Sequence, residues 1–380
     1  MTDRPPPPPV VERLDAAHGH ELACLRTLTA ISQAMDLDRF PRVTLAHLPT
    51  PLEPLERLTR RLGGPRLFIK RDDCTGLAFG GNKTRKLEFL LGEALAEGAD
   101  TVITAGGVQS NHVRQSAAAA AKLGLAAELV LTRNVAWTKD DYDRTGNLQL
   151  DRLLGARVHF FPGETDRAAV MEELADTIRA KGGHPYVIPV GGSNAVGALG
   201  YVACAHELTE QAEALGLEFD TVVVPSSSGG TLAGLTVGLA ALGHPARVIG
   251  IDVDADTEEV RRIVAEIAEA TRALLGLSGG PPPDAIAVEG GYAGDAYGLP
   301  TGEMTEAVTL LAKEEGIILD PVYSGKAMAG LLGLIAQGRL KPENRVIFLH
   351  TGGTPALFAY RSLFAQDAAQ DAPGGDLTKI

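Results

Sequence analysis

The feature that most constrains this chain is an alternation of short apolar runs with alanine-rich or amphipathic segments, which begins after Arg39. Helices are expected at 84–97 and 110–123, where apolar residues recur on one helical face. Alternation of this kind requires right-handed crossovers and gives parallel sheets covered by helices on both faces. The sequence therefore predicts an α/β protein. Its expected strands are 67–70, 101–104, 128–131, 158–161, 186–189, 221–224, 248–252 and 346–350.

Composition narrows the classes of partner and the compartment. The net charge of −13 argues against a nucleic-acid partner, which would demand a basic surface. The 3 cysteines lack zinc-binding spacing, so no metal site is expected. No apolar run of about 18 residues and no secretory signal is visible, so we expect no membrane association and a cytoplasmic location.

The chain contains no fingerprint of a nucleotide-binding enzyme. No G-x-G triplet and no Walker sequence occurs anywhere, so a dinucleotide-binding dehydrogenase is disfavoured. A cofactor, if there is one, must be held by other segments.

The most informative segment surrounds Lys83. Two glycines, Gly80 and Gly81, allow the backbone to approach a flat ligand, and Asn82 offers a hydrogen-bond donor to a phenolate oxygen. A lysine that opens a buried helix has a depressed pKa and can form a Schiff base. The alternative is a solvated basic patch that Lys83 forms with Arg85 and Lys86.

Two further strand–helix turns have ligand-binding character. Ser110 and Asn111 precede the alanine-rich helix, where free backbone N–H groups would bind a carboxylate; the alternative is a plain N-cap. The small residues from Pro225 to Thr231 form a phosphate cradle at a helix N-terminus; the alternative is a glycine-rich tight turn.

Taken together, these segments resemble the family of D-cysteine desulfhydrase and 1-aminocyclopropane-1-carboxylate (ACC) deaminase, fold-type II enzymes that use pyridoxal 5′-phosphate (PLP). The resemblance spans about Leu37 to Tyr360. Its carrying motifs are Lys70-Arg-Asp-Asp, Gly80-Gly-Asn-Lys-Thr-Arg-Lys-Leu-Glu, Gln109-Ser-Asn-His, Gly191-Gly-Ser-Asn, Asp320-Pro-Val-Tyr-Ser-Gly-Lys and His350-Thr-Gly-Gly-Thr-Pro-Ala. L-Cysteate sulfo-lyases are close relatives within this resemblance.

The resemblance implies a role for each motif, with Lys83 carrying PLP as a Schiff base. The implied catalytic residues are Lys83, Ser110, Tyr292 and Tyr323. The implied cofactor-binding residues are Asn82, Lys83, Ser227, Ser228, Gly229, Gly230, Thr231, Tyr323 and Ser324. The implied substrate-binding residues are Ser110, Asn111, His112 and Thr351.

The resemblance also implies two three-layer domains with parallel sheets and the cofactor in the cleft between them. The large domain is expected to comprise 37–85 and 196–366, and the small domain 86–195. Residues 1–36 form a proline-rich N-terminal extension with a possible helix, and 367–380 a flexible tail. Gly106–Gly107 and Gly191–Gly192 are candidate hinges, and a homodimer is expected by analogy.

Two positions bear on the reaction. ACC deaminases typically carry a carboxylate where this chain has Ser324, and leucine where it has Thr351. A carboxylate keeps the pyridine nitrogen protonated, whereas a hydroxyl makes the ring a weaker electron sink, sufficient when a good leaving group departs. We therefore expect β-elimination from D-cysteine, releasing sulfide, pyruvate and ammonia.

Several alternatives stay open. They are L-cysteate sulfo-lyase activity, with Arg114 or Lys326 holding the sulfonate, ACC deamination, β-replacement by a second nucleophile, and a PLP-binding regulatory protein without lyase turnover.

Overall fold

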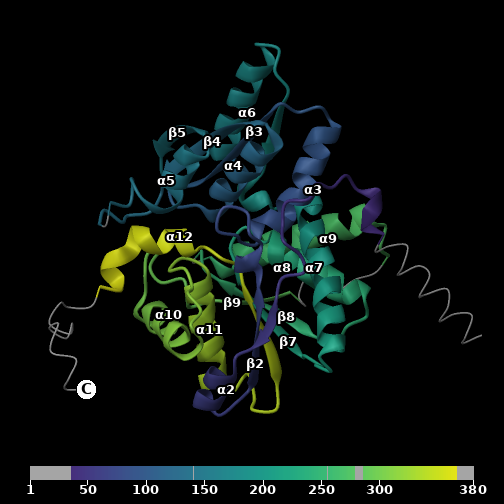
Figure 1. Cartoon of the computed structure of the whole chain (residues 1–380), viewed down its shortest axis with the longest axis vertical. Helices are drawn as coiled ribbons and strands as arrows, with labels where there is room; N and C mark the ends of the chain where they lie inside the picture. Colours follow the sequence, from purple (N-terminus) through teal and green to yellow (C-terminus); the bar gives the residue numbers. More distant parts are fainter. Residues whose placement is uncertain (1–35, 140, 255, 279–285, 366–380) are drawn as a thin grey trace, which may run out of the picture.

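The computed structural model describes residues 36–139, 141–254, 256–278 and 286–365. Within these ranges the chain folds into two sheets flanked by helices, one above the other in Figure 1. The predicted tail 367–380 and all but the last residue of the predicted extension 1–36 lie outside the described residues. In the described part of the chain, no helix combines the length and the apolar character needed to cross a bilayer.

The larger sheet has six strands. Their spatial order is β1 (Leu52–Pro54), β2 (Arg66–Arg71), β10 (Arg345–His350), β7 (Thr221–Ser226), β8 (Arg247–Asp252) and β9 (Ala287–Glu289). All neighbours are parallel except β1 and β2, so the expectation of parallel sheets needs one correction at this edge. Pro54 is compatible with β1 because an edge strand does not need every backbone donor. The sequence pattern missed β1 and β9 because three residues carry no measurable periodicity.

The smaller sheet has four parallel strands. Their order is β5 (Arg157–Pro162), β4 (Ala126–Arg133), β3 (Thr101–Gly107) and β6 (Pro185–Ile188). All four coincide with predicted strands and lie between residues 86 and 195. The division into domains at these bounds remains a proposal.

Helices cover both faces of each sheet. On the larger sheet, α7 (Ala195–Ala214), α8 (Gly230–Ala241) and α9 (Thr257–Leu275) pack on one face, and α2 (Glu56–Leu62), α10 (Gly302–Glu315) and α11 (Ser324–Ala336) on the other. On the smaller sheet, α4 (Asn111–Leu123) and α5 (Gly146–Leu153) lie opposite α6 (Arg167–Arg179). The remaining helices are α3 (Lys83–Ala96) and α12 (Thr354–Leu357), with 3-10 turns at Leu37–Arg39, Asp72–Cys74, Val190–Gly192 and Phe358–Leu363.

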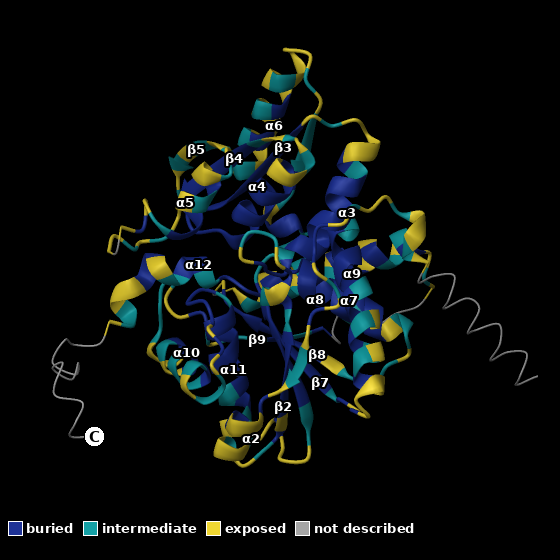
Figure 2. Ribbon diagram, in the orientation of Figure 1, coloured by how far each residue is buried: buried dark blue, intermediate teal, exposed yellow. Residues whose placement is uncertain are grey.

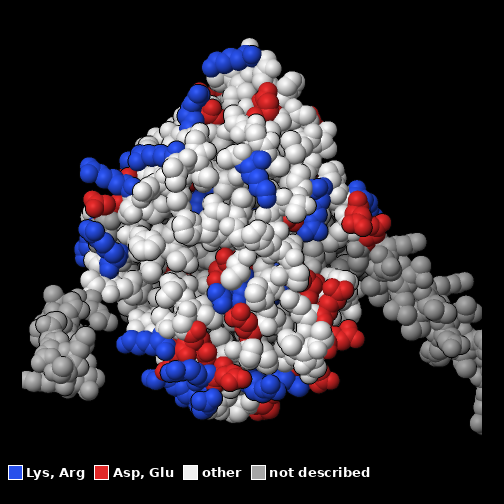
Figure 3. Space-filling view, in the orientation of Figure 1, with Lys and Arg blue, Asp and Glu red and all other residues white. Residues whose placement is uncertain are grey.

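Strand periodicity explains why both faces are covered. In β7, Val222 and Val224 point into the core beneath α7, α8 and α9, whereas Val223 points into the core beneath α10 and α11. Successive strand side chains alternate between faces, and full burial of one valine stabilises by about 1.5–3 kcal/mol. The strands are accordingly dark in Figure 2, and yellow residues gather on outer helix surfaces. On the face in Figure 3, acidic and basic side chains are interspersed.

A buried charge network fixes the start of α3. The guanidinium of Arg85 donates to both carboxylate oxygens of Asp72, each at 2.9 Å, and to both of Glu207, at 2.9 and 2.8 Å. Lys70 and Tyr201 donate to the same carboxylates. Because these groups come from β2, α3 and α7, the network holds the first turn of α3 in place against both other elements.

Candidate active site

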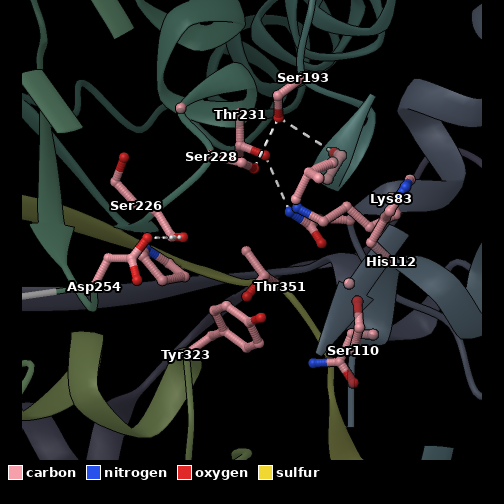
Figure 4. Close-up of a pocket in the computed structure, with 18 of the residues that line it drawn as sticks. Lys83, Ser110, His112, Ser193, Ser226, Ser228, Thr231, Asp254, Tyr323 and Thr351 are labelled. Carbon is pink, nitrogen blue, oxygen red and sulfur yellow. Dashed lines mark hydrogen bonds between the residues drawn. The ribbon is translucent and has the colours of Figure 1, made fainter. Parts of the chain in front are cut away.

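A cavity of about 490 Å³ lies where the carboxyl ends of both sets of strands meet. Its wall includes the start of α3 and the turns that follow β3, β6, β7, β8 and β10. Ligands of open parallel sheets bind at this edge, because the turns that follow the strands present backbone and side-chain groups there. The cavity is large enough for a cofactor and a small substrate together. Figure 4 shows labelled side chains from both sheets around it.

Lys83 lies at the cavity because the preceding loop is wound in the left-handed region. Gly80 and Gly81 have φ values of 65° and 130°. A Cβ on Gly80 would lie 1.9 Å from the carbonyl oxygen of Asp73, and one on Gly81 would lie 2.5 Å from Gln115 Nε2. Only glycine fits at either position. Burial lowers the pKa of Lys83 to about 8, so roughly a tenth of the amine is neutral at pH 7, far more than for an ordinary lysine.

The structure rejects a solvated basic patch at this segment. Arg85 and Lys86 are both buried, and of the three basic residues in this segment Lys83 and Lys86 line the cavity whereas Arg85 does not. Lys86 Nζ donates to the Gly191 carbonyl oxygen at 3.1 Å and to Ser193 Oγ at 3.0 Å. Burial and the neighbouring Lys83 lower the pKa of Lys86 well below its usual value. Sequence reasoning gave Lys86 no role, since its direction depends on the tertiary packing of α3.

The turn from β7 into α8 is shaped to hold an anion. Gly229 has a φ of 81°, and a Cβ on Gly230 would lie 2.8 Å from Ser193 Oγ and 2.9 Å from Lys86 Nζ. Ser228 Oγ lies 2.8 Å from Ser193 Oγ, as Figure 4 shows. The free N–H groups of the α8 N-terminus, these hydroxyls and the Lys86 amine together suit a phosphate group.

The predicted cofactor residues are placed unequally around the cavity. Ser227, Ser228, Gly229 and Thr231 line it, whereas Gly230 lies beneath its wall. Asn82 Nδ2 donates to Thr231 Oγ1 at 3.0 Å and so ties the start of α3 to the start of α8.

The N-terminus of α4 contributes the group expected to bind a carboxylate. Ser110 caps the helix, its Oγ accepting from Val113 N at 3.3 Å. Ser110, Asn111 and His112 all line the cavity. His112 Nε2 pairs with Thr104 Oγ1 at 2.8 Å, but its buried Nδ1 has no hydrogen-bond partner. An unpartnered polar atom in a buried wall indicates that a ligand completes the site.

The structure corrects one predicted catalytic residue. Tyr292 does not line the cavity; its ring lies against Gly333 of α11, and its hydroxyl accepts from Gln337 at 3.5 Å. The tyrosines that line the cavity are Tyr297 and Tyr323, and their hydroxyls pair with each other. Tyr292 and Tyr297 both lie in the glycine-rich segment between β9 and α10, and its turns send one outward and the other inward.

Burial determines the protonation of the two cavity tyrosines. It raises the pKa of Tyr297 to about 12 and that of Tyr323 well above its usual value. Both hydroxyls therefore stay protonated at neutral pH and act as hydrogen-bond donors rather than as bases.

The two positions that bear on the reaction lie at different depths. Thr351 lines the cavity, and its carbonyl oxygen accepts from Asn82 N at 3.0 Å. Ser324 is fully buried behind the wall, and its hydroxyl donates to Asp320 Oδ1 at 2.6 Å. Ser324 thus does not line the cavity as the prediction of direct cofactor contact required.

Neither residue considered for a sulfonate reaches the cavity. Arg114 is buried and donates to the carbonyl oxygen of Gly80 and to Asn147, and Lys326 is buried against the carbonyl oxygens of Ala293 and Ala296. The charged side chains of the wall that sequence reasoning missed are Arg167 and Asp254. Arg167 is the first residue of α6 and Asp254 lies in the loop after β8, and neither has a recognisable motif around it.

The chain also matches a family model, described as pyridoxal-phosphate dependent enzyme, over residues 43–352. Two relatives are ACC deaminases of Burkholderia vietnamiensis (strain G4 / LMG 22486), 47% identical over 336 residues, and of Burkholderia cenocepacia (strain ATCC BAA-245 / DSM 16553 / LMG 16656 / NCTC 13227 / J2315 / CF5610), 46% identical over 335. Each match covers 87% of this chain and 99% of the relative. The chain belongs to the ACC deaminase family of PLP-dependent enzymes.

Solved structures agree with this assignment. The crystal structure of an ACC deaminase homologue has a TM-score of 0.78 and 40% identity, with 86% of this chain and 97% of that chain covered. The processed form of threonine deaminase isoform 2 from Solanum lycopersicum shares the fold, with a TM-score of 0.59, 18% identity and coverage of 91% and 86%. The protein is therefore a fold-type II, PLP-dependent lyase, and its cavity residues fit that cofactor.

Proposed function

We propose that this lyase catalyses β-elimination from a small β-substituted α-amino acid, with D-cysteine as the reference substrate. The observation that supports this choice is the hydroxyl at residue 324, where the resemblance implies a carboxylate in ACC deaminases. Ser324 has no charge to offer, and its hydroxyl proton is already engaged in the hydrogen bond to Asp320. Among the described residues of the cavity wall, Asp254 is the one carboxylic acid.

The wall supplies distinct subsites for cofactor and substrate. Lys83 would hold the aldehyde carbon of PLP, and the α8 N-terminus with Ser228 and Lys86 would hold its phosphate. The α4 N-terminus, with Ser110 and Asn111, would bind the substrate carboxylate. When bound, the cofactor withdraws electrons from the substrate α-carbon.

Proton transfer can be assigned from pKa. Once the substrate amine replaces it, the Lys83 amine is a base of pKa about 8 and would remove the proton from the α-carbon. Tyr323, bonded to Tyr297, would donate a proton to the departing sulfur at the β-carbon. The released aminoacrylate then takes up water to give pyruvate and ammonia.

An absorbance spectrum followed by a substrate panel tests the proposal. The purified protein should be yellow, and Lys83→Ala should lose the band of the covalently held cofactor. D-Cysteine, L-cysteine, L-cysteate and ACC are then assayed for 2-oxo acid and ammonia. We expect pyruvate and sulfide from D-cysteine, and none from the Lys83→Ala variant.

ACC deamination is the second candidate, because two relatives at 46% and 47% identity are named for it. It predicts 2-oxobutanoate from ACC and no sulfide from D-cysteine, which would overturn β-elimination. A yellow protein that turns over none of the four substrates would instead favour β-replacement or a regulatory protein. Adding a thiol nucleophile and looking for a new amino acid would separate those two.

A further inference from the structure

The cavity wall contains a cation that the proposed chemistry leaves unused. Arg167 is the first residue of α6 and lines the cavity from the side of the smaller sheet. Its Nε donates to Thr132 Oγ1 at 2.9 Å. With the Asn134 amide turned so that both its groups are satisfied, Arg167 Nη2 donates to it at 3.1 Å. Within the described part of the chain, Nη1 makes no hydrogen bond.

The side chain is held in place by neutral partners, so its charge stays available. Arg167 forms no ion pair among the described residues, although many surface arginines of this chain do. The position of Arg167 in the first turn of α6 is electrostatically unfavourable, because the positive end of the helix dipole lies there. The arginine therefore does not serve the stability of α6, and its positive charge is directed to the cavity.

The contacts around Gly107 relate the position of this charge to that of Tyr297. A Cβ on Gly107 would lie 3.0 Å from Asn134 Oδ1 and 3.7 Å from Tyr297 Cε1. Asn134, which holds Arg167, thus lies beside Tyr297 at the end of β3. Ser110, three residues after Gly107, begins the carboxylate subsite. A substrate bound there by its carboxylate would extend its β-substituent toward Tyr297 and Arg167.

The other two basic side chains of the wall, the lysines, have roles or partners of their own. Lys83 is the cofactor lysine of the proposed function, and Lys86 is bonded to Gly191 and Ser193 at the phosphate cradle. Arg167 is the one arginine in the described wall. The carboxylate of the wall belongs to Asp254, which interacts with Arg167 electrostatically but accepts its hydrogen bond from Ser227, at 2.9 Å.

We infer that Arg167 determines specificity by binding a negatively charged substituent on the substrate β-carbon, such as a sulfonate. This inference rests on the proposed β-elimination and names its substrate class. The α-carbon loses its proton, and the electron pair of that C–H bond forms the new double bond. The carbon–sulfur bond breaks with its pair leaving on sulfite. Hydrolysis of the aminoacrylate gives pyruvate and ammonia, with no external oxidant or reductant.

A matched pair of substrates tests the inference in the holoenzyme. L- and D-cysteate carry the anionic group, whereas β-chloroalanine offers the same anchoring groups with a neutral substituent. Loss of one charge-assisted contact should lower kcat/KM of Arg167→Met for cysteate by about 30- to 100-fold. For β-chloroalanine we expect a change below about threefold. Arg167→Lys should recover part of the loss, and Arg179→Met, at the exposed far end of α6, should change neither substrate.

A binding measurement separates this inference from the proposed function. 3-Sulfopropanoate cannot react because it has no amine, and propanoate is its neutral counterpart at the distal end. Calorimetry on the holoenzyme should show tighter binding of 3-sulfopropanoate, and Arg167→Met should abolish the preference. Asp254→Asn should increase the preference for 3-sulfopropanoate, because it removes a carboxylate that repels the sulfonate. If the enzyme eliminates no group from any of these substrates but still binds 3-sulfopropanoate more tightly than propanoate, the proposed function fails and the assignment of Arg167 stands. Equal losses for charged and neutral ligands in Arg167→Met would overturn the assignment.

Discussion

At the scale of single residues, this cavity controls protonation by burial. The pKa of Lys83 is lowered to about 8 and that of Tyr297 raised to about 12, in both cases chiefly by desolvation. Desolvation disfavours whichever form is charged, so the lysine becomes a usable base and the tyrosine a retained acid. One physical effect thus prepares the two opposite roles that an elimination requires.

The first prediction concerns the pH dependence of cofactor uptake. Only the neutral Lys83 amine can attack an aldehyde, and its lowered pKa makes that form appear at lower pH than in a free lysine. The rate of PLP attachment to the apoprotein should therefore rise with pH and reach half its maximum near pH 8. Stopped-flow absorbance measures it. A half-maximum near 10.5, the value of an unperturbed lysine, would show that the amine is not desolvated.

The second prediction distinguishes the two tyrosines that the sequence could not. Tyr297→Phe removes a hydroxyl bonded to Tyr323 in the cavity, so kcat should fall by about 100-fold. Tyr292→Phe alters only a contact with α11 and should leave kcat and KM unchanged. Steady-state kinetics of both variants on the same substrate decides between them. The opposite ranking would restore Tyr292 to the catalytic set.

At the scale of elements, the helix that begins with Lys83 is held by buried charges. Arg85 makes paired contacts with Asp72 of the turn after β2 and with Glu207 of α7. Such a network adds little to the free energy of unfolding compared with well-packed apolar side chains. Removing one member is strongly destabilising, because a buried charge is then left without a partner. It fixes the orientation of α3 more than it raises overall stability.

The third prediction follows from that asymmetry. Arg85→Met should lower the free energy of unfolding by about 3–5 kcal/mol, because Asp72 and part of Glu207 lose their counter-charge. Arg262→Met is the matched control, since Arg262 also contacts two carboxylates, those of Glu259 and Glu266, but at the surface. It should have little effect, because exposed pairs are screened by water and salt. Urea denaturation compares the two; equal effects would show that burial does not matter here.

At the scale of the whole molecule, the cavity belongs to neither sheet alone. The proposed phosphate cradle follows β7 of the larger sheet, and the proposed carboxylate subsite follows β3 of the smaller one. Gly107 at the end of β3 and the pair Gly191–Gly192 after β6 also line or adjoin this wall. They remain candidate hinges for closure over a substrate.

The fourth prediction tests whether cofactor and substrate analogue couple the sheets. Binding to the folded state alone adds about 2.7 kcal/mol of stability when the free ligand is at 100 times its Kd. PLP should therefore raise Tm and slow amide exchange at the starts of α3 and α8, and 3-sulfopropanoate should extend that protection to the start of α4. Thermal melting and hydrogen exchange measure both effects. Protection by the analogue that stays within the larger sheet would contradict a site shared between them.

The sequence by itself determined the elements and the motifs whose signals are local. Periodicity predicted β2 and β3 at their places, and glycines marked the left-handed turns before Lys83 and α8, because only glycine adopts those angles freely. The capping residue Ser110 likewise predicted the start of α4. The same signals could not predict β1 and β9, which are too short to show a pattern.

Only the tertiary structure decided which side chains of loops and helix starts enter the cavity. Tyr292 and Tyr297 share one glycine-rich loop, and Ser324 turns to Asp320 rather than to the cavity because the buried carboxylate accepts a hydrogen bond from its hydroxyl. Arg167 has no motif around it, and its role depends on Thr132 and Asn134, more than thirty residues away. Local sequence sets backbone angles, but the direction of a loop side chain is set by partners that are remote in the chain.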